Sequence, residues 1–85
     1  MRICFSSDGW DDYLYWQKEN MAILAKINSL VRDIRRDPSE RGIAKAERLK
    51  GDLSGFLSKR IDGEHRLIYR ISDDSLLIIQ CRFHY

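Results

Sequence analysis

The second half of this chain brings together residue types that bind anions and move protons. Arg66 and Arg82 lie in two apolar segments, and His84 follows Arg82 by two positions. Arginine binds phosphate with parallel hydrogen bonds, and histidine is the side chain whose unperturbed pKa allows proton transfer near neutrality. His84 is the next-to-last residue, and chain ends normally fray, so it can transfer protons at a defined site only if its strand holds it in place.

The apolar pattern predicts one strand, two helices, a loop and three further strands. Residues 2–5 form the first strand, and a helix whose N-cap candidates begin at Ser6 is interrupted at Asn20. A second, amphipathic helix follows from Ala22 and is stopped by Pro38. A loop with one short helical turn and then three strands are expected over residues 39–53, 55–60, 64–72 and 76–85.

Side chains alternate between the faces of a strand, so loop lengths decide which of these residues meet. A loop of odd length at residues 73–75 matches apolar with apolar side chains on the last two strands. This register places Arg66 opposite Arg82 and Glu64 opposite His84.

The preceding hairpin allows two loops, and the sequence leaves the choice open. A three-residue loop at residues 61–63 places Ser58 opposite Arg66, whereas a two-residue turn places Lys59 there. The three-residue loop gathers a polar patch on one face, made of Ser58, Arg60, Glu64, Arg66, Arg82 and His84. The alternative interpretation is a solvated face in which Glu64 pairs with Arg60 and Arg66.

Such a patch suits the cleavage of RNA without a metal ion. This reaction needs a base near the 2′-hydroxyl, an acid near the leaving 5′-oxygen and cations around the phosphorane. His84 is a candidate acid, and Arg66 with Arg60 are candidates for stabilising the transition state. The base is then Glu64 or, from the polar loop, Glu47.

Other chemistry-bearing residues favour structural roles. Trp10 and Trp16 lie at helical spacing, which is more typical of core and interface than of base stacking. His65 falls on the apolar face and is expected to be packed and hydrogen-bonded. For Tyr85 the sequence leaves two roles open, packing on the core side of the sheet or contact with an RNA base.

Composition places the chain among small globular domains. It has 85 residues, 44% of them hydrophobic, and a formal net charge of +2, so one domain over residues 1–85 is expected. The two cysteines, Cys4 and Cys81, lack metal-ligand spacing and read as free core thiols, so neither a metal nor a cofactor is predicted. No signal segment or bilayer-spanning run is present, and a cytoplasmic location away from membranes is expected.

Several segments resemble the YoeB family of the RelE/ParE toxin superfamily, and together they span nearly the whole chain. They read WDDYLYWQ (10–17), LSGF (53–56), EHRL (64–67), DDSLLI (73–78) and CRFHY (81–85). The resemblance implies an α+β, RelE-like (microbial-RNase-like) fold, with a mainly antiparallel sheet and two N-terminal helices packed on one face.

The resemblance also implies an activity and partners. A member of this family is expected to be the toxin of a type II toxin–antitoxin system and an endoribonuclease that cuts mRNA in the ribosomal A site. The product would be a 2′,3′-cyclic phosphate, formed by attack of the 2′-hydroxyl. A YefM-type antitoxin, a toxin homodimer and operator DNA bound only together with the antitoxin are the expected partners.

The family's site residues fall on positions that match its motifs. The general base falls on Glu47, the transition-state arginine on Arg66 and the general acid on His84. Supporting positions fall on Lys50, Arg60, Glu64 and Tyr85. The alternative function is a non-catalytic toxin that binds a protein target such as gyrase, as another branch of the superfamily does.

Overall fold

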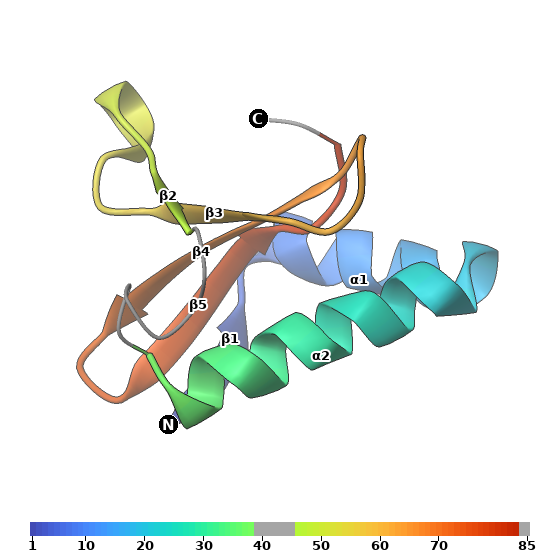
Figure 1. Cartoon of the computed structure of the whole chain (residues 1–85), viewed down its shortest axis with the longest axis horizontal. Coiled ribbons are helices and arrows are strands. Elements are labelled where there is room, and N and C mark those ends of the chain that lie inside the picture. The colour runs from blue at the N-terminus through green and yellow to red at the C-terminus, as the bar shows by residue number, and fades with distance from the viewer. Residues whose placement is uncertain (39–45, 84–85) are drawn as a thin grey trace.

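A single mixed sheet with both helices on one face makes up the architecture, and no helix of the described chain covers the other face (Figure 1). The computed structural model describes residues 1–38 and 46–83. Its elements, in order, are β1 (Arg2–Phe5), α1 (Ser7–Glu19), α2 (Met21–Arg36), β2 (Glu47–Arg48), the 3-10 turn η1 (Gly51–Leu53), β3 (Leu57–Arg60), β4 (Arg66–Ser72) and β5 (Ser75–Gln80). The strand order is β1-β5-β4-β3-β2, with β1 parallel to β5 and the other pairs antiparallel.

Local sequence explains where the helices begin and end. The Ser6 hydroxyl caps α1 by accepting from the Gly9 N–H at 3.1 Å. Asn20 ends α1 and caps α2, because its extended backbone breaks the helix while its side chain accepts from the first amides of α2. The predicted first strand, helix break and helix stop are confirmed.

The core lies between the helices and the inner face of the sheet. Ile27 and Ile34 of α2 meet Leu67 and Tyr69 of β4, and Trp16 of α1 packs in the same cluster. Fully burying a large apolar side chain stabilises a fold by about 1.5–3 kcal/mol, so this stripe fixes the helices against the sheet.

The hairpin between β4 and β5 differs from its predicted register. Ser72 pairs with Ser75 around a two-residue turn, in which Asp73 adopts a φ of +54°, so the predicted loop over residues 73–75 is wrong. A register shift next to Tyr69 then brings Ile68 opposite Gln80. This second pairing is the one that the predicted loop would have given, because a bulge adds one residue to one strand.

The hairpin between β3 and β4 has a longer loop than either predicted form. Arg60 pairs with Arg66, so residues 61–65 form the connection. The Asp62 carboxylate accepts from the N–H groups of Glu64 at 2.8 Å and His65 at 2.7 Å, which delays the start of β4. The change from the three-residue loop is an even number of residues, so the predicted faces of the strands are kept.

Two further boundaries needed correction. The last strand, predicted over residues 76–85, ends at Gln80. The predicted loop over residues 39–53 contains the strand β2 as well as the expected helical turn, here η1. Neither helix of the described ranges is long and apolar enough to cross a membrane.

Candidate active site

Strand β2 carries Glu47 onto the face of the sheet that the helices leave uncovered. Glu47 pairs with Ser58 of β3, and the next residue, Arg48, pairs with Leu57. Because neighbours along a strand point to opposite faces, Glu47 lies over the open face and Arg48 over the helix side. Leu57 belongs to the core cluster, which confirms this assignment of the faces.

Glu47 and Arg66 form an ion pair across β3. The Glu47 Oε1 and Arg66 Nη1 atoms are 3.6 Å apart, and the two side chains are 53% and 18% exposed. The carboxylate is therefore solvated while the guanidinium is largely shielded. A loose pair of this kind contributes little to stability, and its carboxylate can leave the arginine for another partner.

A second arginine lies beside this pair. Arg60 is directly opposite Arg66 in the β3–β4 ladder, so both side chains project to the same face. Facing like charges destabilise a sheet, and among the described residues Glu47 is the carboxylate in contact with Arg66. Lys50, three residues after Glu47 and beyond the end of β2, is exposed. An anion bound here would relieve the repulsion.

The hydroxyl of Ser58 lies at the centre of this arrangement. Ser58 is paired with Glu47 on one side and Ile68 on the other, and it is fully buried. In the part of the chain that the structure describes, its Oγ atom has no hydrogen-bond partner. Lys59, which a two-residue turn would have placed opposite Arg66, instead faces the helix side, and its burial lowers its pKa.

Two members of the predicted patch have other contacts. Arg82 does not pair with Arg66, because β5 has already ended, and its guanidinium lies over the Tyr15 ring at 3.5 Å from the centroid. Glu64 has its carboxylate 3.6 Å from Nε2 of His65, so its predicted ion pairs with the arginines give way to this contact. His84 and Tyr85 lie outside the described residues.

Helix α1 holds the chain just after β5. The Asp12 carboxylate accepts from the Cys81 N–H at 3.0 Å, and the Trp16 indole donates to the Cys81 carbonyl at 2.8 Å. Burial raises the pKa of Asp12, and the bond from Cys81 opposes that rise. This role of Asp12 was not predicted from the sequence. Its spacing of four residues from Trp16, on one helix face, was the available signal.

The start of β4 and the residue before it hold the same segment two residues further on. The Phe83 N–H donates to His65 Nδ1 at 2.8 Å, and the Arg66 N–H donates to the Phe83 carbonyl at 3.0 Å. His65 is 7% exposed, which confirms that it is packed and hydrogen-bonded. The main chain of Arg66 therefore contacts the residue that precedes His84.

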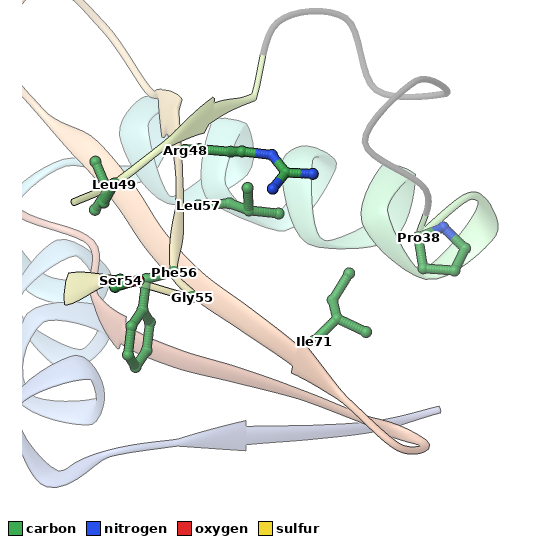
Figure 2. A pocket seen from close by; sticks show the side chains of 8 residues that line it. All are labelled: Pro38, Arg48, Leu49, Ser54, Gly55, Phe56, Leu57 and Ile71. Atoms are coloured by element: carbon green, nitrogen blue, oxygen red, sulfur yellow. The ribbon is translucent and has the colours of Figure 1, made fainter.

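A pocket of about 250 Å³ lies on the other side of β2 and β3. Figure 2 shows Arg48 and Leu57 extending in the same direction from these neighbouring strands, with Ile71 and Pro38 beyond them. Because it opens on the helix side, this pocket is separate from Glu47 and Arg66. Within the described ranges, no group of three or more histidine, cysteine or acidic side chains is arranged to hold a metal ion.

The architecture is the α+β fold of the RelE-like toxins. Residues 5–85 match the model of the YoeB-like toxins of bacterial type II toxin–antitoxin systems, and the chain belongs to this family. It is 55% identical to toxin YoeB of Escherichia coli over the full length of both proteins.

Solved structures of related toxins have the same fold. A YoeB/ParE toxin from Agrobacterium tumefaciens superposes with a TM-score of 0.92 at 45% identity and full coverage of both chains. YoeB of Staphylococcus aureus, solved in complex with YefM and as a dimer, gives TM-scores of 0.89 and 0.90 at 41% and 40% identity. Each of these two superpositions covers all of this chain and 98% of the Staphylococcus aureus chain. The predicted family and fold class are confirmed.

Proposed function

We propose that this type II toxin is an endoribonuclease that cuts mRNA by general acid–base catalysis. The observation that carries the proposal is the Glu47–Arg66 pair at 3.6 Å, with Arg60 alongside on the open face of the sheet. A carboxylate and two guanidinium groups together supply a base and a binding site for the phosphorane.

The reaction begins when the RNA phosphate enters between the arginines. Arg66 then exchanges its contact with Glu47 for the phosphate oxygens, which frees the carboxylate. Glu47 takes the proton of the 2′-hydroxyl as that oxygen forms its bond to phosphorus, and Arg66 stabilises the charge of the phosphorane. His84 donates a proton to the 5′-oxygen as its bond to phosphorus breaks, leaving a 2′,3′-cyclic phosphate.

Four further residues support this chemistry in the proposal. Arg60, which lies opposite Arg66, and the exposed Lys50, which follows β2, bind the backbone phosphates. Glu64 acts through His65, whose Nε2 it contacts, and Tyr85 orients the RNA or the acid beside it. The 2′-hydroxyl nucleophile restricts cleavage to RNA.

The cellular target and partners follow from the family. The ribosomal A site presents single-stranded mRNA, and cleavage there would stop translation. A YefM-type antitoxin is the proposed neutralising partner, because the Staphylococcus aureus relative is seen in complex with YefM. That relative is also seen as a dimer, which supports a homodimer here. Operator DNA would be bound only together with the antitoxin, and the protein would act in the cytoplasm.

Mapping of mRNA 5′ ends after induction tests the proposal. Wild type should produce new, codon-linked ends in translated messages, and Glu47→Ala and His84→Ala should not. Growth arrest without new ends would refute the nuclease. Arrest that persists in both variants and is accompanied by DNA damage would instead support a gyrase-binding toxin.

A further inference from the structure

The chain segment at residues 81–83 is held in place without being part of a strand. Strand β5 ends at Gln80, yet the two residues Cys81 and Phe83 each have both main-chain polar groups hydrogen-bonded. The partners of Cys81 lie on α1, and those of Phe83 are Arg66 at the start of β4 and His65 just before it. Figure 1 shows this end of the described chain running beside the loop that joins β3 and β4.

His65 provides the one side-chain contact to Phe83 among these bonds. Its Nδ1 accepts from the Phe83 N–H, so the imidazole is the neutral tautomer with its proton on Nε2. Nε2 lies 3.6 Å from the Glu64 carboxylate, which favours that tautomer. The imidazole also packs against the Trp16 ring in a T-shaped arrangement, with centroids 4.7 Å apart.

The bonds to Phe83 hold it in a conformation that it would not adopt by itself. Its φ is +67°, in the left-handed region that bulky side chains rarely occupy. Such a conformation persists only where the surroundings determine it, and here the N–H and C=O of Phe83 are both occupied. The described chain is therefore held in place up to Phe83.

We propose that His65 is a positioning residue that, together with Asp12, holds residues 81–83 against the main chain of Arg66, and that cleavage depends on this attachment because the proposed acid, His84, follows Phe83 in the sequence. Asp12 fixes the segment at Cys81, and His65 fixes it at Phe83, directly beside the main chain of Arg66. The inference rests on the proposed function for the acid role of His84. The positioning itself depends only on the contacts of the described residues.

Two substitutions at His65 separate its hydrogen bond from its packing. His65→Phe keeps a ring against Trp16 and removes the acceptor. His65→Asn removes the ring and keeps an acceptor at the δ position. Both are compared with wild type by amide hydrogen exchange of ¹⁵N-labelled protein and by steady-state cleavage of an RNA on programmed ribosomes. In wild type, long-range ¹H–¹⁵N spectra should show the tautomer protonated on Nε2.

His65→Phe should raise the exchange rate of the Phe83 amide about tenfold, the value of one lost hydrogen bond. It should lower kcat about a hundredfold, the cost of a misplaced catalytic group, with KM unchanged because Arg60 and Lys50 are untouched. In His65→Asn, the exchange rate of the Phe83 amide and kcat should both return most of the way to their wild-type values. An unchanged exchange rate, an unchanged kcat, or a loss that appears only in KM would overturn the proposal.

Asp12→Ala tests the same inference from the helix side if His65→Phe does not fold. It should raise amide exchange at Cys81 and lower kcat without changing KM, and normal kcat in a folded Asp12→Ala protein would overturn the proposal. The two proposals fail separately. A wild-type protein that cuts no RNA refutes the nuclease, whereas the exchange rates at Cys81 and Phe83 still test the positioning.

Discussion

The Glu47 carboxylate lies 3.6 Å from the Arg66 guanidinium, although the two residues belong to strands separated by β3. Glu47→Gln keeps the size of the side chain and removes the base. We expect cleavage to fall about 10²–10⁴-fold, the usual value of one general base. Because the pair is partly solvated, the free energy of unfolding should change by less than about 1 kcal/mol. Single-turnover kinetics and urea denaturation measure both effects. Asp52→Asn is the control, and a fully active Glu47→Gln protein would refute the assignment of the base.

Gly9 is the point where α1 comes closest to β5. A Cβ atom at this position would clash with the Ile78 carbonyl oxygen, a backbone atom that cannot move aside. Gly9→Ala should therefore lower the free energy of unfolding by about 1–3 kcal/mol, as overpacking does, although alanine favours a helix. Gly63→Ala is the matched control, because a Cβ there meets nothing within 4 Å. Thermal unfolding of both variants checks this, and equal stability would show that α1 can shift.

Asp12 and Asp62 should make opposite contributions to the pH dependence of stability. Burial raises the pKa of Asp12 above 3.8, so its stabilising contribution is complete below that pH and is lost as pH rises through the folded-state pKa. Hydrogen bonds from Glu64 and His65 lower the pKa of Asp62, so its contribution is present above 3.8 and is lost as pH falls through the folded-state pKa.

Asp12→Asn and Asp62→Asn test this pair of signs by urea denaturation at about pH 7 and about pH 3. The free energy of unfolding of Asp12→Asn, taken relative to wild type, should be larger at the higher pH. That of Asp62→Asn, taken in the same way, should be larger at the lower pH. If the stability difference from wild type changed with pH in the same direction for both variants, the assignment would be contradicted. The comparison needs no activity.

The two cysteines should differ in reactivity. Burial raises the pKa of the Cys81 thiol to about 12, whereas Cys4 is only half-buried on the edge strand β1. A thiolate is the reactive form, so a thiol reagent at about pH 8 should label Cys4 and leave Cys81 unmodified until the protein unfolds. Mass spectrometry of native and denatured protein counts the labels, with Cys4→Ser as the control. Rapid native labelling of Cys4→Ser would show that residue 81 leaves its place on α1.

The helices could be predicted from local signals because their caps are local. Ser6 and Asn20 each satisfy amides within three residues, and the stripe from Ile23 to Ile34 repeats at helical spacing. Strand β2 carries no such signal. Its two residues form a strand only because Ser58 and Leu57 lie opposite them.

The site could be predicted only in part, because it too depends on pairing between strands that are distant in sequence. The charge pattern singled out Arg60 and Arg66 but left the base open between Glu64 and Glu47. Register decides which carboxylate meets Arg66, and the register depended on a bulge and on the cap formed by Asp62. Turns of different length have similar energies, so residue types alone could not choose between them. The resemblance to the family named Glu47, which is the carboxylate that meets Arg66.

The parallel pairing of β1 with β5 has a consequence for synthesis. The Ser6 hydroxyl and the Ile79 carbonyl, 73 residues apart in sequence, are hydrogen-bonded beside this pairing. Contacts between distant residues form late and slow the folding of a domain. During translation β1 waits for a partner until β5 has left the ribosome. The sheet, and with it the face that carries Glu47 and Arg66, is therefore completed only near the end of the synthesis of this domain.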